Sequence, residues 1–271
     1  MKHAAIALEN VSFTYFGSSQ PVLTDLTCEI PYGALTVISG ASGEGKTTLL
    51  SILNGSIPRV TDGTLTGTIW LDGQDSRELS MGAISHYIGS VLQNAEDQII
   101  HSRVEDEVAF GCENMAVPAD EIQERVAKAL ERMELGADWA TETLSGGQKQ
   151  RLITATTLAM GQKIVLLDEP LANLDLDGSL QLLTVLKDLA AEGYAVLLVE
   201  HRLDVTLPFA SRLLWLQDGR LTAYDDPAAT FSHVEQVIPR ADRLEGTKEQ
   251  IPLFVLKDVS CEIGGAYSRF D

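Results

Sequence analysis

The chain has 271 residues, is 45% hydrophobic, and carries 20 lysine and arginine residues against 39 aspartate and glutamate residues, a formal charge of −19. This length fits one large domain with or without an appendage, and the hydrophobic content is sufficient for a buried core, which argues against a disordered chain. So acidic a surface repels phosphate backbones and anionic lipid, which disfavours nucleic acid and lipid surfaces as partners.

The cysteines and the lengths of the apolar runs exclude further classes of protein. Cys28, Cys112 and Cys261 lie far apart without a Cys-x-x-Cys pair, so we expect reduced thiols rather than a zinc ribbon or a disulfide framework. The residues after Met1 lack a long apolar core, and no signal peptide is expected. Apolar runs such as Ala195–Val199 are far shorter than the roughly 20 residues that span a bilayer, so a membrane process would need another subunit to cross it.

Short apolar runs alternate with longer amphipathic stretches along the chain, which predicts an α/β domain with a buried, mostly parallel sheet. Ligands of such sheets bind beyond the carboxyl ends of the strands, where the polar motifs of this chain begin. In chain order, we expect exposed-faced strands in the first forty residues and at Thr64–Gly73, helices at Val104–Met115 and Asp120–Met133, and a hairpin turn at Asp218-Gly219. The predicted buried strands are Leu35–Ser39, Ile164–Leu167 and Ala195–Val199.

The first polar motif reads Gly40-Ala-Ser-Gly-Glu-Gly-Lys46-Thr47 and lies between a buried strand and a helical stretch. It fits the phosphate-binding pattern Gly-x4-Gly-Lys-[Ser/Thr], in which glycines let backbone N–H groups point at the β-phosphate. Lys46 can then reach the β- and γ-phosphates, the Thr47 hydroxyl can bind Mg²⁺, and Glu44 must point away. The predicted nucleotide contacts of this loop are Gly40, Ser42, Gly43, Gly45, Lys46, Thr47 and Thr48.

The second motif is the carboxylate pair Asp168-Glu169, which ends a buried strand. Adjacent strand residues point to opposite faces, so the two acids are expected to have different roles. We assign Asp168 to the Mg²⁺ hydration shell and Glu169 to the attacking water, which it orients and polarises.

The third motif, Leu144-Ser-Gly-Gly-Gln-Lys-Gln-Arg151, opens a helix that is expected to run to about Met160. It presents N–H groups and a serine hydroxyl at a helix start, which is a second anion site. One nucleotide does not need two such sites. We therefore predict that each ATP lies between the phosphate loop of one chain and this turn of another, with contacts from Ser145, Gly146, Gly147 and Gln148.

In order and approximate spacing, the three motifs resemble those of ABC-type ATPases over roughly residues 5–225. The resemblance implies a P-loop NTPase (RecA-like) core with a mostly parallel sheet, an N-terminal antiparallel β subdomain, and an inserted α-helical subdomain at about residues 95–160. It implies ATP and Mg²⁺ as cofactors and ATP hydrolysis as the reaction. Residues 1–225 would form the ATPase domain and residues 226–271 a C-terminal tail.

The same resemblance implies roles for residues outside the three motifs. Tyr15 would stack on adenine, and Gln93 would join Thr47 and Asp168 at Mg²⁺ and report occupancy to a membrane partner. Asp175 would make contacts across the dimer. His201 would contact the γ-phosphate and hold the catalytic acid, so that the implied catalytic residues are Lys46, Gln93, Glu169 and His201.

Three further segments resemble the energy-coupling-factor (ECF) importers and their cobalt or nickel relatives. They are Gln93–Ile100, Val104–Gly111 and Glu200–Asp204, although Ala95 stands where the family often has proline. This resemblance implies a second ATPase subunit, a transmembrane coupling subunit contacted through Gln98 and the helix from Val104, a substrate-capturing membrane subunit, and a place at the cytoplasmic face of the membrane.

Two rival functions remain in view, namely the ATPase of another ABC transporter class and an ABC-type ATPase acting on nucleic acid or the ribosome. The chromosome-type members carry a long coiled coil between the glutamine loop and the serine-glycine turn. Only about fifty residues separate Gln93 from Ser145, too few for that insertion, and the acidic surface disfavours the ribosome.

One internal repeat is present near the end of the chain. Val22–Ile30 and Val255–Ile263 are identical at six of nine positions. Two amphipathic strands can resemble each other by chance, and residues past about 250 can also begin a truncated second copy of the domain, since some members carry two ATPase domains. In both cases we expect a poorly anchored tail.

Overall fold

The computed structural model describes residues 4–225, 227, 259–263 and 266–270, which fall into two units, residues 1–233 and 234–271. In the second unit, β11 (Val259–Ile263) pairs antiparallel with β12 (Ala266–Phe270). The first four residues of the second repeat copy, 255–258, lie outside the described residues. Both interpretations of the repeat therefore stay open.

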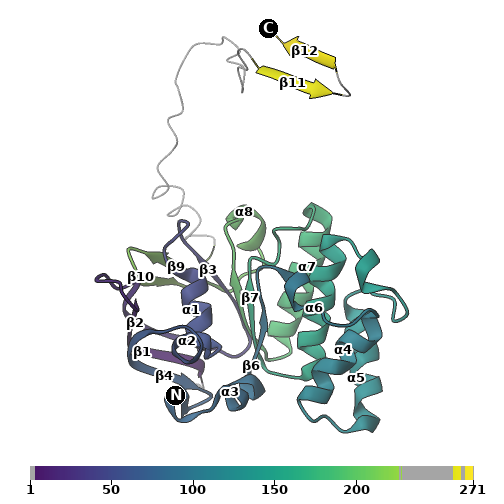
Figure 1. Cartoon of the computed structure of the whole chain (residues 1–271). Coiled ribbons are helices and arrows are strands. Elements are labelled where there is room, and N and C mark those ends of the chain that lie inside the picture. Colours follow the sequence, from purple (N-terminus) through teal and green to yellow (C-terminus); the bar gives the residue numbers. More distant parts are fainter. Residues whose placement is uncertain (1–3, 226, 228–258, 264–265, 271) are drawn as a thin grey trace. The chain divides into compact units, whose positions relative to one another are not determined.

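The first unit contains a six-stranded sheet made of β3 (Ala34–Ser39), β6 (Ile88–Val91), β7 (Ile164–Asp168), β8 (Ala195–Val199), β9 (Arg212–Gln217) and β10 (Arg220–Tyr224). The strands run in the order β10-β9-β3-β8-β7-β6, and all neighbouring pairs except β9 with β10 are parallel (Figure 1). Every residue of β3, β7 and β8 is buried, as continuous apolar strands in a covered parallel sheet should be. The predicted mostly parallel sheet is confirmed.

A second sheet is antiparallel and consists of β1 (Ala4–Tyr15), β2 (Leu23–Pro31), β4 (Gly63–Leu71) and β5 (Gln74–Asp75). Its order is β2-β1-β4-β5. Buried and exposed residues alternate over much of β2 and β4, because one face of each strand packs on the core and the other faces solvent. This sheet is the N-terminal antiparallel β subdomain implied by the family resemblance.

The described part of the first unit contains the helices α1 (Lys46–Leu53), α2 (Ser56–Arg59), α3 (Met81–Tyr87), α4 (Val104–Asn114), α5 (Ala119–Arg132), α6 (Gly146–Met160), α7 (Leu176–Ala191) and α8 (Leu203–Thr206), with short 3-10 turns η1 (Ser76–Glu78), η2 (Ala95–Gln98) and η3 (Thr141–Thr143). Helices α4, α5 and α6 pack on one another beside the larger sheet (Figure 1). The amphipathic α5 buries Val126, Ala129 and Leu130, which recur at helical spacing. The predicted helices agree with α4 and α5 to within one residue at each end.

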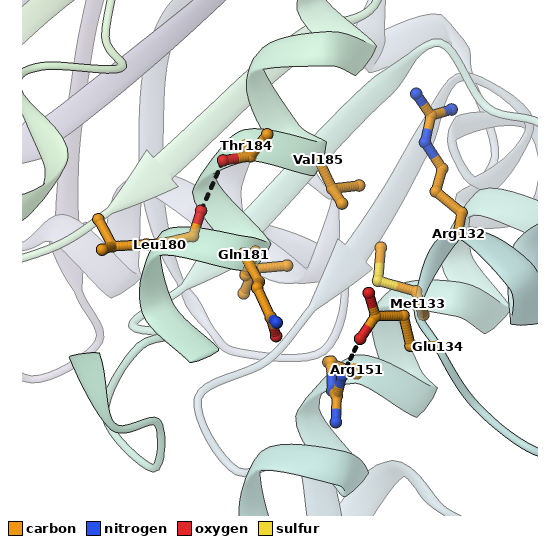
Figure 2. Close-up of a pocket in the computed structure, with 9 residues that line it drawn as sticks. Arg132, Met133, Glu134, Arg151, Leu180, Gln181, Thr184 and Val185 are labelled. Carbon is orange, nitrogen blue, oxygen red and sulfur yellow. Dashed lines mark hydrogen bonds and ion pairs between the residues drawn. The ribbon is translucent and has the colours of Figure 1, made fainter. Parts of the chain in front are cut away.

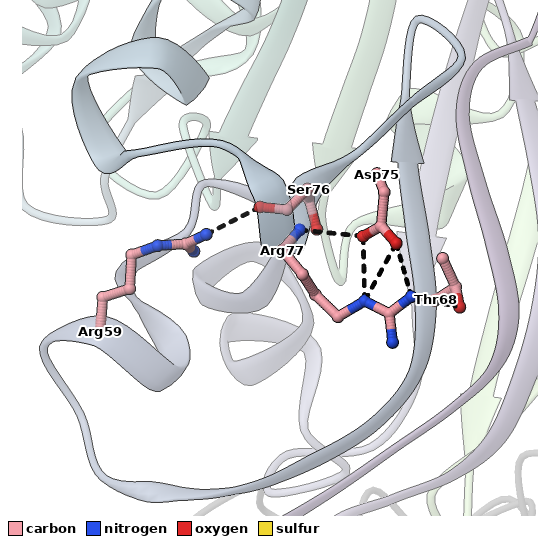
Figure 3. A network of polar contacts seen from close by, with 5 residues as sticks. All are labelled: Arg59, Thr68, Asp75, Ser76 and Arg77. Carbon is pink, nitrogen blue, oxygen red and sulfur yellow. Dashed lines mark hydrogen bonds and ion pairs between the residues drawn. The ribbon is translucent and has the colours of Figure 1, made fainter.

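A polar network connects the segment after α1 to the antiparallel sheet (Figure 3). The Arg59 guanidinium at the end of α2 donates to the carbonyl oxygens of Ser76 at 2.7 Å and Leu79 at 2.9 Å. Asp75 accepts hydrogen bonds from both the backbone N–H and the side chain of Arg77, which lowers the pKa of Asp75. The network holds η1 against α2, and therefore close to the helix that follows the phosphate loop.

The predicted hairpin turn between β9 and β10 is confirmed. Asp218 and Gly219 have φ values of 50° and 67°, the positive angles that a tight two-residue hairpin requires. A Cβ at Gly219 would lie 2.6 Å from the Val22 carbonyl oxygen, so glycine also permits the close approach of this turn to β2. Among the described helices, none is both long enough and apolar enough to cross a membrane.

The central strand β8 gives the first prediction. Leu197 is fully buried, so Leu197→Ala should lower the free energy of unfolding by about 2–5 kcal/mol, because it leaves a cavity in a core that cannot fully collapse. Leu176 is 56% exposed, and Leu176→Ala should change the free energy of unfolding by less than about 0.5 kcal/mol. Urea titration of both variants measures the difference, and equal losses would contradict the assigned core.

Candidate active site

Parallel pairing brings the predicted motifs to one edge of the larger sheet. β3 ends at Ser39 and β7 at Asp168, directly before Gly40 and Glu169 respectively. β6 and β8 end at Val91 and Val199, so Gln93 and His201 follow at the same edge. Loops at the carboxyl ends of parallel strands form the usual ligand site of such a sheet.

The phosphate loop leads from β3 into α1, and two of its glycines are required by geometry. Gly40 has φ 155°, and a Cβ there would lie 2.1 Å from the carbonyl oxygen of Leu216. Gly45 precedes α1 with φ 99°, where a Cβ would meet Val22 at 2.8 Å. The loop can therefore curl tightly at the N-terminus of α1, where N–H groups can bind phosphate.

Lys46 is the first residue of α1 and is only 5% exposed. Its ammonium donates to the carbonyl oxygens of Gly40 at 3.0 Å and Ala41 at 2.7 Å. Burial lowers the pKa of Lys46, and the nearby acids Glu169, Glu44 and Asp168 act in the opposite direction. The cation is thus enclosed by the loop, where a triphosphate could offer it stronger acceptors than these two carbonyls.

Asp168 has the surroundings expected of a Mg²⁺ site. It is 4% exposed, and within the described structure its buried Oδ1 has no hydrogen-bond partner. Burial raises the pKa of Asp168, while a hydrogen bond from Thr47 lowers it. An unpartnered buried carboxylate oxygen beside a threonine hydroxyl fits Mg²⁺, which prefers oxygen ligands and completes its shell with water and phosphate.

Glu169 is held between two side chains from other strand ends. Its Oε2 accepts a hydrogen bond of 2.9 Å from Gln93 Nε2, and its Oε1 lies 3.0 Å from His201 Nε2. The Glu169 side chain is 25% exposed, so water can reach it. Its φ of 48° is unusual for a residue with a side chain and turns the chain sharply after β7. The structure therefore brings together three of the four predicted catalytic residues, and Lys46 lies close enough for its charge to act on Asp168.

Tyr15 ends β1 close to α1. Its hydroxyl shares a 2.8 Å hydrogen bond with Thr48 Oγ1, and its ring meets Phe13 edge to face at 4.8 Å between centroids. The ring is thus fixed beside the helix that follows the phosphate loop. Stacking of Tyr15 on adenine remains a prediction.

The serine-glycine turn caps α6. Ser145 Oγ accepts from the Gln148 N–H at 3.3 Å, and Gln148 Oε1 accepts from the Ser145 N–H at 2.8 Å, which together form a capping box. A Cβ at Gly147 would lie 2.8 Å from the end of the Leu174 side chain, so a larger residue there would require Leu174 to move. The side chain of Gln148 shapes the turn, while Ser145 and Gly146 are exposed.

This turn and the loop before α7 line one open cavity of about 450 Å³. Asp175 caps α7 by accepting from the Gly178 N–H at 2.8 Å. No residue of the phosphate loop lines the cavity. The two predicted anion sites of the chain therefore belong to separate surfaces of the described unit.

A neighbouring cavity of about 340 Å³ lies between α7 and the ends of α5 and α6 (Figure 2). Met133, Leu180 and Val185 contribute apolar side chains to it, and Arg151 lies 3.6 Å from Glu134. None of the predicted site residues lines this cavity. This cavity is therefore not part of the predicted ATP site.

Sequence analysis missed several contacts around Gln93. Gln98, the expected partner contact, accepts from the Leu92 N–H at 2.8 Å and donates to the Ser90 carbonyl oxygen at 3.3 Å, so its side chain holds the end of β6. Lys149 of α6 forms an ion pair with Glu96 of η2. In the sequence, only the motifs that contain Gln98 and Lys149 mark these two residues. Hydrophobic periodicity does not predict their contacts, because each contact joins two different segments of the chain.

Comparison with known proteins identifies the family of the chain. The sequence profile of the ABC transporter family matches residues 23–172. A Saccharolobus solfataricus protein whose name describes an ABC transporter ATP-binding protein is 33% identical over 253 residues, or 93% of this chain and 46% of that protein. The chain spans about half the length of such curated relatives.

Two solved structures are similar over most of their length. The structure of cbiO1 from Clostridium perfringens, described as part of the ABC transporter complex cbiONQ, has a TM-score of 0.77 and 28% identity, covering 87% of this chain and 93% of that chain. The dimeric ATP-binding cassette MJ0796 bound to ADP and Pi has a TM-score of 0.69 and 26% identity, covering 81% and 98%.

The fold and the site define an ATP-binding cassette. Because the family profile matches more than half of the chain, the protein belongs to the ABC transporter family. The α/β fold with an antiparallel N-terminal sheet and helical insertions is confirmed.

The two adjacent carboxylates give a paired prediction. Glu169→Gln should keep ATP binding and lower turnover roughly 10²–10⁴-fold, because it removes the group that polarises the attacking water. Asp168→Asn should instead weaken the Mg²⁺ dependence of ATP binding, because it neutralises the buried metal-facing oxygen. Phosphate release and nucleotide binding with and without Mg²⁺ measure both. Normal turnover in Glu169→Gln would disprove its assigned role.

Proposed function

We propose that this chain is the ATP-hydrolysing subunit of an ECF-type importer of vitamins or metal ions, working as half of a nucleotide-binding pair. The observation that carries the proposal is Glu169 held between Gln93 and His201, with the serine-glycine turn on a separate surface. The likeness to cbiO1, which is described as part of the ABC transporter complex cbiONQ, supports the subtype.

In the proposed reaction, the residues of the phosphate loop bind and orient the triphosphate. Lys46 neutralises its charge, while Thr47, Asp168 and Gln93 would hold Mg²⁺, which stabilises charge developing on the phosphate oxygens. Glu169 polarises the attacking water, and His201 orients Glu169 and contacts the γ-phosphate. Ser145, Gly146 and Gly147 of a second chain supply N–H and hydroxyl donors to the same nucleotide, and Asp175 contacts the partner.

The composite site would make the pair a switch. With ATP present, donors from both chains bind one triphosphate and hold the chains together; after hydrolysis those shared contacts are lost and the pair opens. Because Gln93 contacts Glu169 and lies next to exposed Leu92, opening and closing would move this surface. The partner in the pair is either a second copy of this chain or a related ATPase subunit.

The surface after β6 would bind the membrane subunits. Leu92 and Ile100 are 49% and 68% exposed, and the exposed acids Glu96, Asp97, Glu105 and Asp106 surround them in the chain. An apolar element with flanking basic side chains complements such a surface. We infer that this element belongs to a transmembrane coupling subunit, which with a substrate-capturing subunit holds the ATPase at the cytoplasmic face of the membrane.

The shared site can be tested by mixing two inactive variants. Lys46→Ala removes the phosphate-loop cation, and Ser145→Asp keeps a good helix cap while it places a negative charge against the neighbour's phosphates. If sites are shared and chains mix at random, an equal mixture should regain about a quarter of the normal activity, because half of the pairs have one intact site. Val60→Asp adds the same charge at a 69% exposed position outside the proposed site, and it is the control that should stay active alone. Activity no higher than the average of the two variants would contradict sharing.

The membrane partner can be tested through Ile100. Ile100→Asp should abolish co-purification of a coupling subunit and a small substrate-capturing subunit from detergent-solubilised membranes, while ATP turnover of the isolated chain stays within about twofold, since the change lies on the surface. Val60→Asp is the matched control, because Val60 is 69% exposed and lies after α2. Recovery of ribosomes or DNA in place of the two membrane subunits would overturn the importer assignment.

A further inference from the structure

We propose that Glu200 is a positioning residue for ATP hydrolysis, because its buried carboxylate joins the loop that carries Glu169 to the loop that carries His201. The inference rests on the proposed role of Glu169 and does not depend on the type of transporter. Glu200 is not expected to touch the nucleotide, and it acts through the residues that do.

The carboxylate of Glu200 accepts hydrogen bonds from both loops. Glu200 is 3% exposed, its Oε1 accepts from the Leu171 N–H at 2.9 Å, and its Oε2 accepts from the His201 N–H at 3.2 Å. The Arg202 N–H also donates to it. Leu171 lies two residues after Glu169, so one buried side chain holds the backbone next to both members of the 3.0 Å Glu169–His201 contact.

A second set of contacts extends the same connection to α7. The Arg202 guanidinium donates to Ser179 Oγ at 3.2 Å and lies 3.5 Å from the Leu171 carbonyl oxygen. Ser179 in turn donates to the Asp175 carbonyl oxygen at 2.7 Å. The loop after β8 is therefore tied both to the chain after Glu169 and to the helix cap that is predicted to contact the partner.

The backbone at Glu169 needs such support. A φ of 48° is sparsely populated for a residue with a side chain and persists where surrounding contacts hold it. Glu200 forms no ion pair within the described residues, and burial raises its pKa. A buried carboxylate that is stabilised chiefly by backbone N–H groups of two catalytic loops fixes their separation, which a neutral apolar side chain would not do.

The test compares two carboxylate-to-amide exchanges. Glu200→Gln keeps the size of the side chain but turns one acceptor into a donor that faces an N–H group. We expect kcat to fall about 10-fold to 100-fold, as small misplacements of catalytic groups do, with KM for ATP within about twofold. The control Asp75→Asn makes the same exchange in the network of the antiparallel sheet (Figure 3) and should leave kcat unchanged. A kcat for Glu200→Gln within about twofold of the original, or an equal loss of ATP affinity, overturns the proposal.

A double-mutant cycle separates positioning from general support of the fold. If Glu200 acts through the Glu169–His201 contact, then Glu200→Gln in a His201→Ala background should lower kcat by less than about threefold, since the contact is already lost. Losses that multiply in the double variant would contradict the proposal, because they would show independent actions.

The partly buried residue Arg202 provides the test if the Glu200→Gln variant cannot be recovered folded. Arg202→Gln removes the contact with Ser179, and a lower kcat at unchanged KM supports the proposal, whereas an unchanged kcat overturns it. The Glu169→Gln variant distinguishes a failure of the proposed function from a failure of the inference about Glu200. Normal turnover there defeats the proposed function itself, while a slow Glu169→Gln with normal Glu200 and Arg202 variants defeats only this inference.

Discussion

Gln93 and Glu169 are 76 residues apart in the chain, yet their side chains lie within a hydrogen-bond distance of 2.9 Å. Glu169 and His201 are 32 residues apart, and their side chains lie 3.0 Å apart. Parallel pairing of β6, β7 and β8 produces these contacts, because it aligns the strands so that their carboxyl ends share one edge. Pairing of β3 with β8 adds the phosphate loop to that edge. The contacts of Glu169 with Gln93 and His201 depend on this register, which the fully buried strands hold in place.

Two adjacent acids at this edge have different surroundings, which support the different roles that we propose for them. Asp168 remains in the strand, is 4% exposed and leaves one buried oxygen without a partner. Glu169 leaves the strand through a positive φ, reaches solvent and is held by Gln93 and His201. A buried carboxylate oxygen suits a metal ion, and a partly exposed, oriented carboxylate suits a water molecule. Burial and the backbone turn, rather than residue type, distinguish the two proposed roles.

Local sequence was sufficient for the phosphate loop, the Asp168-Glu169 pair and the capping turn at Ser145, because each follows from a buried strand or helix start next to a short motif. The α/β class, α4 and α5 were predicted from the alternation of short apolar runs with longer amphipathic stretches. Sequence analysis did not predict α7, although its apolar residues recur at helical spacing. Predicting the partners of Gln93 and Glu200 requires the register of the sheet, and predicting the contacts of Gln98 and Lys149 requires the packing of the loops. Hydrophobic periodicity reports neither the register nor the loop packing.

The central claim is that one triphosphate is bound by the Lys46 loop of one chain and the Ser145 turn of another. Light scattering of the Glu169→Gln protein tests it most directly, since this variant should hold ATP without consuming it. With Mg²⁺ and ATP, the protein should have twice the 29.4 kDa mass of a single chain. The double variant that carries both Glu169→Gln and Ser145→Asp should have the mass of a single chain. A protein that remains at the single mass with saturating Mg²⁺ and ATP would contradict the account.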